Sequence, residues 1–196
     1  MDFHREHHVD LRVRKTREAI KNTFKEMICE MPAEKITMKE LADRAMIHRK
    51  TFYLHYTSIE ALYQDMMAEI ADGYYEEMEK IKPPYSHKEV NRIFFTYYAE
   101  QDKYVERLIC EPSYRTFCNK LHTATLQHNL NRYNPYSQFS TEKQNMINTF
   151  LVVSSLELYR QWVSDGKKMP LEEVIELTGK LLDEGISGLM TKWLVY

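Results

Sequence analysis

Glycine and proline are scarce in this sequence, with 5 and 6 copies among 196 residues. Such a composition argues against β-sandwiches, propellers and disordered chains, which are richer in these residues. The glycines stand at positions 73, 166, 179, 185 and 188, so no GxGxxG or GxxxxGKS/T motif occurs. The Gly-rich loops that hold nucleotide phosphates are therefore not expected here.

Disulfides, membrane spans and a secretion signal are not expected either. Cys29, Cys110 and Cys118 are odd in number and lack CxxC spacing, which indicates reduced thiols rather than a disulfide framework. No run of 18 apolar residues occurs, so no membrane-spanning helix is expected. The N-terminal segment MDFHREHHVDLRVRK lacks the apolar stretch of a signal peptide. We therefore expect a cytoplasmic protein.

The charge is nearly balanced overall but unevenly distributed. The formal net charge is −2, whereas residues 1–55 hold 12 basic and 9 acidic residues and the remainder holds 15 and 20. Such asymmetry between segments is typical of a small basic module attached to an acidic body. The sequence thus directs the search for a nucleic-acid-binding segment to the first 55 residues.

Apolar residues recur at helical spacing almost throughout the chain, which predicts an all-α fold. Capping signals precede several of the expected helices, as at Thr37, Ser86 and Thr141, and prolines end others, as at Pro32. About nine helices are expected, over residues 11–31, 37–45, 48–56, 58–81, 86–100, 103–110, 113–132, 141–162 and 170–194.

The second and third expected helices, joined by a tight turn, predict a helix-turn-helix. This motif places its second helix in the major groove, where basic and hydrogen-bonding side chains meet bases and phosphates. The residues expected to contact DNA are Thr37, Lys39, His48, Arg49, Lys50, Thr51, Tyr53 and His55. Thr37 and Lys39 begin the second helix, where hydroxyl, ammonium and free backbone N–H groups can bind a phosphate.

A basic leader precedes this motif. Its four cations are Arg12, Arg14, Lys15 and Arg17. They fit an arm that contacts an adjacent phosphate or the minor groove, and they fit equally the solvated face of the first helix. Both interpretations stay open at this stage.

Two sets of residues follow a known spacing. The first set is Thr37, Leu41, Ala42, Ala45, Ile47, Thr51, Phe52, Tyr53, His55, Tyr56, Ser58, Glu60 and Leu62. The second, weaker one is Trp162-Val-Ser-Asp-Gly166 followed by Pro170-Leu-Glu-Glu173. Through them the chain resembles the TetR/AcrR-family transcriptional regulators, over residues 16–63 and at the joint between the last two helices.

Three positions depart from the family pattern. Met46 stands in place of the turn glycine, so the turn either avoids positive φ or is slightly strained. His48 replaces the Ser or Thr that caps the recognition helix, which makes a weaker cap but brings an imidazole within reach of DNA. Ile59 replaces a lysine that contacts a phosphate, so one expected backbone contact is missing.

The resemblance implies a helix-turn-helix domain over residues 1–57 and a larger helical domain over 58–196, with residues 58–81 as the connecting helix. It also implies an effector pocket among the middle helices, although the aromatic residues there also fit a plain core. The pocket candidates are Phe94, Tyr97, Tyr98, Tyr114, Phe117, Cys118, His122 and Phe150. A pairing of the last two helices with their copies is implied as well, against the alternative of packing within one chain. The interface candidates are Phe150, Leu151, Ser154, Leu158, Leu181, Gly185 and Leu189.

The sequence therefore predicts a ligand-responsive regulator that represses transcription as a homodimer on a palindromic double-stranded DNA operator, with a small-molecule effector and no membrane partner. A coactivator or adaptor of the same fold is one alternative, favoured by Met46 and Ile59. A small helical enzyme is a more distant one, because neither Cys118 with His122 nor the acidic run 76–79 completes a nucleophile–base–orienter set.

No cofactor and no metal are expected. The histidines at positions 4, 7 and 8 lack a carboxylate cluster to complete a metal site. We expect them to belong to a flexible, solvated end of the chain.

Overall fold

The computed structural model describes the backbone of residues 3–84 and 86–184, and the side chains in these ranges from residue 11 onward. These residues form nine α-helices and two short 3-10 helices, with no strand among them. The helices are α1 (Phe3–Glu30), η1 (Ala33–Lys35), α2 (Met38–Arg44), α3 (Arg49–Tyr53), α4 (Ile59–Glu79), α5 (His87–Ala99), α6 (Lys103–Cys110), η2 (Pro112–Tyr114), α7 (Arg115–Arg132), α8 (Thr141–Ser164) and α9 (Leu171–Asp183). The predicted all-α fold is confirmed.

The first helix differs most from its prediction. α1 begins at Phe3 rather than Leu11, so the expected flexible leader is helical in its backbone. No proline or glycine interrupts residues 3–30, which lets the helix extend backward by one hydrogen bond per residue. The side chains of the three N-terminal histidines lie outside the described residues.

The capping signals act at the level of single hydrogen bonds. Thr37 Oγ1 accepts from the backbone N–H of Glu40 at 3.2 Å, and a full capping box joins Ser86 and Glu89. In α8 the cap is Ser140 rather than the predicted Thr141, since Ser140 Oγ accepts from the Lys143 N–H. These caps satisfy N–H groups that have no partner within the helix.

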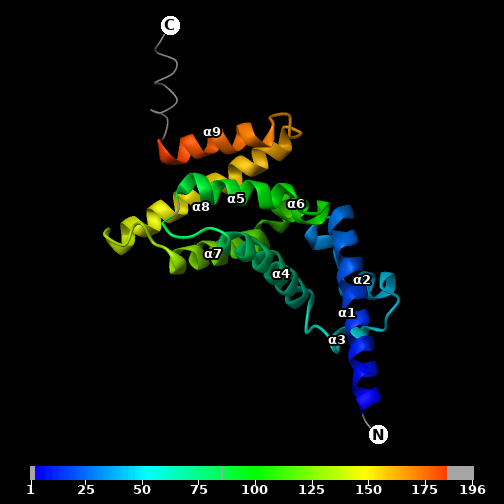
Figure 1. Ribbon diagram of the computed structural model, residues 1–196. Helices are drawn as coiled ribbons and strands as arrows, with labels where there is room; N and C mark the ends of the chain where they lie inside the picture. The colour runs from blue at the N-terminus through cyan, green and yellow to red at the C-terminus, as the bar shows by residue number, and fades with distance from the viewer. Residues whose placement is uncertain (1–2, 85, 185–196) are drawn as a thin grey trace.

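Helices α1, α2 and α3 form a three-helix head, and α4 leads from it into a body made of α5 to α9 (Figure 1). α3 lies at one end of the molecule and α9 at the other (Figure 1). The head has its own core, in which Ile20, Phe24, Leu41 and Phe52 are fully buried. The apolar faces of α1, α2 and α3 therefore share one core that helps to position α3.

The head also contacts the body away from α4. Tyr114 Oη donates to the Met31 carbonyl at 2.7 Å, and the Ala33 N–H donates to Ser113 Oγ at 3.2 Å. Lys25 Nζ lies 4.8 Å from the centre of the Tyr104 ring, where α1 packs on α6. The sequence indicated the 58–81 helix as the only connection between the two halves, but folding adds this second contact.

In the part of the chain that the structure describes, no helix has the length and apolarity needed to cross a membrane.

Candidate nucleic-acid interface and ligand cavity

α3 is a short helix held by one buried residue. Phe52 is fully buried in the head, and the rings of Phe52 and Tyr56 lie 5.9 Å apart. Around it His48, Arg49, Lys50 and Tyr53 are exposed, Tyr53 by 56% of its surface. Thr51 and His55 are half-buried. The folding of the head thus turns the predicted DNA-contacting side chains outward.

The N-terminus of α2 contributes Thr37 and Lys39, which are both exposed. The Thr37 hydroxyl oxygen accepts the capping hydrogen bond from Glu40, so its own hydrogen remains available for a phosphate oxygen. His48 caps α3 by backbone geometry alone, because its side chain makes no capping hydrogen bond. The imidazole of His48 is thereby left at the surface.

The turn between α2 and α3 has a positive φ at a non-glycine residue. Met46 has φ 53° and is 91% exposed. The Ile47 N–H donates to the Ala42 carbonyl at 3.0 Å and the Met46 N–H to the Asp43 carbonyl at 3.2 Å, which is the hydrogen-bond pattern of a Schellman C-cap. Of the two alternatives for this turn, the strained one is observed, because the C-cap requires a left-handed residue where this sequence has methionine.

The basic leader divides into two groups. Arg12 and Lys15 are exposed and make no ion pair within the described residues, and they border a shallow groove between α1 and Ile47. Arg14 lies 4.0 Å from Glu18 on the same helix. Arg17 instead is bound at the surface, where it donates to Tyr56 and Asp65 while about half of its side chain stays exposed, at 48%. Arg17 therefore serves as a structural contact between head and body.

Asp65 stands at the centre of a charged cluster that joins α1, α4 and the residues after α3. It accepts from Arg17 at 2.5 Å and from the Tyr56 hydroxyl at 2.8 Å, and Lys21 Nζ lies 2.5 Å away. Burial alone would raise the pKa of Asp65, but these three partners outweigh it and lower the pKa to about 2. The cluster holds the end of the recognition segment against α4.

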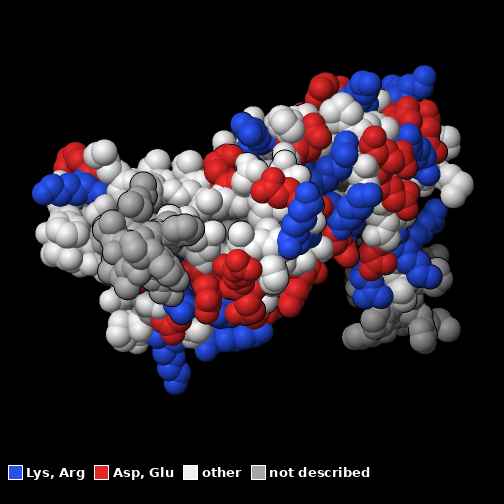
Figure 2. All heavy atoms as spheres, turned by 90° about the horizontal axis from the view of Figure 1, so that it is seen from above, with Lys and Arg blue, Asp and Glu red and all other residues white. Residues whose placement is uncertain are grey.

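Charges of both signs are mixed on the body. Seen from above, basic and acidic side chains are interspersed near the head end, whereas the end with the α7–α8 connection carries few charges (Figure 2). The predicted DNA face differs, because Arg12, Lys15, Lys39, Arg49 and Lys50 form no ion pair within the described residues. Unpaired cations on the head are what a polyanion needs.

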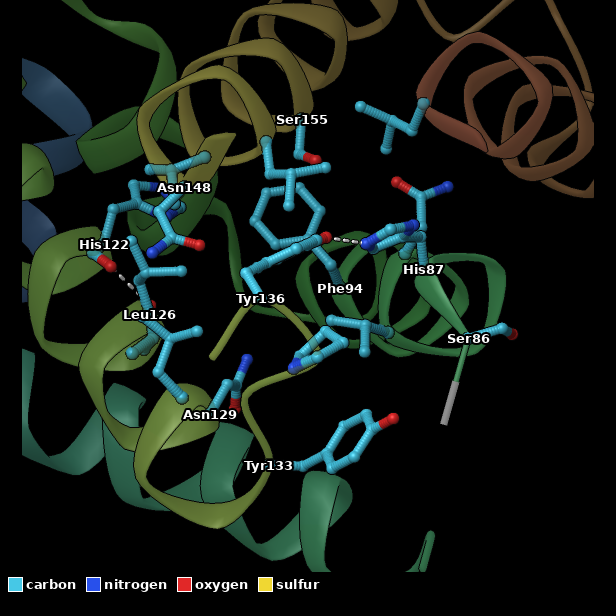
Figure 3. Close-up of a pocket in the computed structure, with 18 of the residues that line it drawn as sticks. Ser86, His87, Phe94, His122, Leu126, Asn129, Tyr133, Tyr136, Asn148 and Ser155 are labelled. Carbon is cyan, nitrogen blue, oxygen red and sulfur yellow. Dashed lines mark hydrogen bonds between the residues drawn. The ribbon is translucent and has the colours of Figure 1, made fainter. Parts of the chain in front are cut away.

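The body contains a cavity of about 120 Å³, partly open to solvent, between α5, α7, α8 and the connection before α8 (Figure 3). Phe94 and His122, two of the predicted pocket residues, line it. Tyr74 of α4 lines it as well. Aliphatic side chains from α5, α7, α8 and α9 complete most of the wall.

Three buried polar side chains face this cavity without a complete set of partners. His122 Nε2, Asn148 Oδ1 and Asn91 Oδ1 have no hydrogen-bond partner among the described residues, and His122 is only 4% exposed. Burial, together with the nearby Arg160 cation, lowers the pKa of His122 to about 4. His122 is therefore neutral at physiological pH, and unsatisfied polar atoms are concentrated on the cavity wall.

The remaining predicted pocket residues lie elsewhere. Tyr97 donates to the Ile70 carbonyl at 2.7 Å, Tyr114 reaches Met31, and Tyr98 is buried beside the cavity. Phe117 stacks on Tyr63 at 4.0 Å. Neither Cys118 nor Phe150 lines the cavity. Cys118 is buried and Phe150 is exposed. Burial raises the pKa of the Cys118 thiol to about 11, which keeps it protonated.

Sequence reasoning missed the polar residues of the wall. Asn148 lies on the inward face of α8 with Leu151 and Ser155, and Asn91 lies on the inward face of α5 with Phe94 and Phe95. A polar side chain within an otherwise apolar helical stripe was the available signal. Asn91 Nδ2 donates to Thr178 Oγ1 at 2.7 Å, which ties α5 to α9.

The connection before α8 is fixed to two other elements. The Tyr136 hydroxyl is hydrogen-bonded to His87 Nε2, with the two ring planes nearly parallel (Figure 3). His87 Nδ1 in turn lies 2.7 Å from Asp183 at the end of α9. One side of the cavity is thereby joined to the last described turn of α9.

The predicted interface residues fall into different environments. Phe150 is exposed, and with Met146 and Val153 it forms an apolar stripe on α8. Leu151 lines the cavity, Leu158 packs on the core, and Ser154 and Leu181 are half-buried. Gly185 and Leu189 lie outside the described residues. No group of three His, Cys, Asp or Glu side chains suited to a metal ion occurs among the residues searched, which are the described ones.

Comparison with known proteins assigns the family. Residues 86–184, just over half of the chain, match the family TetR_C_8, described as "Transcriptional regulator C-terminal region". A search of curated proteins finds no match.

Several solved structures share the fold. A TetR transcriptional regulator from Streptococcus agalactiae 2603V is 19% identical, with 88% of this chain and 96% of that chain covered and a TM-score of 0.68. FadR from Bacillus subtilis, in complex with stearoyl-CoA, is 16% identical, with 86% and 98% covered and a TM-score of 0.66. NalD from Pseudomonas aeruginosa, described as the secondary repressor of a multidrug efflux pump, is 13% identical, with 88% and 96% covered and a TM-score of 0.65. The chain belongs to the TetR family of transcriptional regulators, which are not enzymes.

Proposed function

We propose that this protein is a repressor that binds a palindromic operator as a homodimer and leaves it when a small molecule occupies the body. In this proposal residues 1–57 read DNA, and residues 58–196 bind the effector and form the dimer. The observation that carries it is the exposed surface of α3, where Arg49, Lys50 and Tyr53 face solvent while Phe52 is buried in the head. The description of NalD as a repressor supports the direction of the effect.

The contacts divide by chemistry. Arg49 and Lys50 are suited to guanine edges, where a bidentate or charged donor meets two acceptors. Thr37, Lys39 and Tyr53 are suited to phosphate oxygens, which fix the position of the head on the duplex. Arg12 and Lys15 extend the same basic face along α1.

A dimer follows from the small size of the reading element. α3 has five residues, which reach too few base pairs to select one site in a genome. A second copy placed one helical turn away, at about 34 Å, doubles the readout. The exposed α8 stripe of Met146, Phe150 and Val153 supports an isologous contact there.

Coupling between cavity and head runs through α4 and α7. Tyr74 of α4 lines the cavity, and Asp65 near the other end of α4 holds Arg17 and Tyr56. Phe117 of α7 stacks on Tyr63, which meets Phe24 of α1 edge-on at 4.6 Å. A ligand that prefers one placement of α4 and α7 would shift the distance between two recognition helices.

The DNA proposal is tested by fluorescence anisotropy with the DNA upstream of the protein's own gene. Arg49→Ala and Lys50→Ala should each weaken binding by about tenfold. Loss of a phosphate contact, as in Lys39→Ala, should reduce the slope of log affinity against log salt concentration by about 1. Lys168→Ala, an exposed lysine in the α8–α9 connection, is the matched control. Unchanged binding by both α3 variants would overturn the assignment, and a protein partner in place of DNA would then be sought.

The dimer is tested by sedimentation velocity. Phe150→Glu places a charge in the apolar stripe and should convert the dimer to a monomer, because an unpaired charge is costly to bury at an interface. Asn119→Glu, at an exposed position of α7, is the control. A native protein that sediments as a monomer would contradict the proposal.

Repression is tested with a reporter gene behind the same upstream DNA. Expression of the native protein should lower the reporter signal, and Lys50→Ala should restore it. A rise in signal with the native protein would indicate an activator.

A further inference from the structure

Among the described residues, no Asp, Glu, Lys or Arg lines the cavity described above. Most of its surface comes from apolar side chains, among them Val90, Phe94, Leu126, Leu130 and Val152. Of the two histidines on the wall, His87 Nδ1 lies 2.7 Å from Asp183 and His122 is neutral at physiological pH. A charged ligand would therefore lose its water without direct contact with a counter-charge on the wall. The wall favours an uncharged occupant.

The volume limits the size of that occupant. The cavity holds about 120 Å³, close to the roughly 150 Å³ of an engineered apolar cavity that accepts benzene. Aromatic rings from Tyr74, Phe94 and Tyr136 form part of its wall. A single ring is close in size to this space.

Two of the unsatisfied polar atoms lie on the same side of the cavity. His122 and Asn148 line the same side of the cavity in Figure 3, opposite His87. His122 Nε2 and Asn148 Oδ1 lack partners among the described residues, and both side chains are more than nine-tenths buried. Unsatisfied buried polar groups are rare and destabilising. Such a pair points to a ligand that supplies the missing hydrogen bonds.

A hydroxyl group has the donor and acceptor sites that these two atoms lack as partners. A hydroxyl has one donor and two acceptor sites, so it can donate to Asn148 Oδ1 and accept from His122 when Nε2 carries the ring hydrogen. An ammonium ion has no acceptor site, and a carboxylate has no donor. The chemistry of the pair thus selects a hydroxyl over either charged group.

We propose that the cavity binds an uncharged, single-ring compound of phenol size through a hydroxyl group placed between His122 and Asn148. This deepens the proposed function and rests on it, because the same cavity would hold the effector. Binding is measured without DNA and operator release is measured separately, so that failure of one can be told from failure of the other.

The test is isothermal titration of the full-length native protein with phenol, toluene and benzoate. These probes share a ring of similar size and differ in the group attached to it. Phenol should bind, toluene should bind at least tenfold more weakly because it leaves both polar atoms unsatisfied, and benzoate should show no binding. Equal affinity for phenol and toluene, tighter binding of benzoate, or no heat with phenol would each overturn the proposal.

Variants place the site. Asn148→Leu should abolish the preference for phenol over toluene, and His122→Leu should reduce it. Asn145→Leu, an exposed asparagine one turn away on α8, should leave the preference unchanged. If the Asn148→Leu protein still prefers phenol tenfold, the hydroxyl site lies elsewhere and the assignment is refuted. If the native protein binds phenol but no operator DNA, the ligand class stands and the proposed function fails.

Discussion

The neutral, buried His122 makes stability depend on pH in a defined window. Burial and the Arg160 cation lower its pKa to about 4 in the folded protein, against about 6.5 in an unfolded chain. The unfolded state therefore binds the proton more readily. The contribution of neutral His122 to the free energy of unfolding is fully present above about pH 6.5. It is lost as the pH falls and is gone below about pH 4.

The magnitude follows from these two values. Between pH 7 and pH 5 the unfolded imidazole becomes almost fully protonated, while the folded one stays mostly neutral. The free energy of unfolding should fall by about 2 kcal/mol from this group alone. For a chain of this size the melting temperature should drop by roughly 4–8 °C.

The assay is urea unfolding at pH 7 and pH 5, followed by far-ultraviolet circular dichroism. The native protein and His122→Gln are compared, because other groups titrate in both and cancel in the difference. His122→Gln should be less sensitive to acid by about 2 kcal/mol. An equal loss of stability in the native protein and in His122→Gln would refute the reasoning.

Three further predictions concern the head and α4. Asp65→Asn removes the charge that Arg17 and Lys21 share. It should lower the free energy of unfolding by about 1 kcal/mol after screening and weaken operator binding, whereas Glu69→Gln should change neither by much. Equal effects of the two substitutions, in urea denaturation and in anisotropy, would contradict this. Met46→Gly relieves the positive φ of an exposed residue and should stabilise the protein by about 1 kcal/mol, and a lower melting temperature would argue against strain there. Gly73→Ala places a Cβ 2.6 Å from the Tyr97 hydroxyl and should lower the free energy of unfolding. Tyr97→Phe removes that hydroxyl, so in a double-mutant cycle it should recover part of the lost stability. Strict additivity of the two changes would exclude the contact.

Local signals in the sequence were sufficient to predict the helices of the head and its outward residues. The capping threonine at 37, the apolar positions that bury Phe52, and the outward cations Arg49 and Lys50 all follow from helical periodicity and the spacing of one motif. The extent of α1 was underestimated because its polar beginning carries no apolar stripe. The strained turn at Met46 was one of two open alternatives, since the sequence shows a missing glycine but not the backbone angle that replaces it.

The arrangement of side chains in the body depends on contacts between distant segments, which the sequence pattern does not predict. Periodicity indicates which face of a helix points inward, but it does not indicate which inward residues from different helices meet. Phe94 and His122 reached the cavity, whereas Tyr114, Phe117 and Phe150 were directed to other surfaces by the packing of α6, α7 and α8. Arg17 looked like part of an arm until folding brought Asp65 within 2.5 Å of it.

The sequence by itself thus determined an all-helical chain with a basic helix-turn-helix at its beginning, because those features depend on residues within one or two turns of each other. Only the tertiary structure decided that Asn91, His122 and Asn148 share one small cavity with unsatisfied polar atoms. These residues come from three helices far apart in the chain, and their meeting is set by how α5, α7 and α8 pack, which no local pattern encodes.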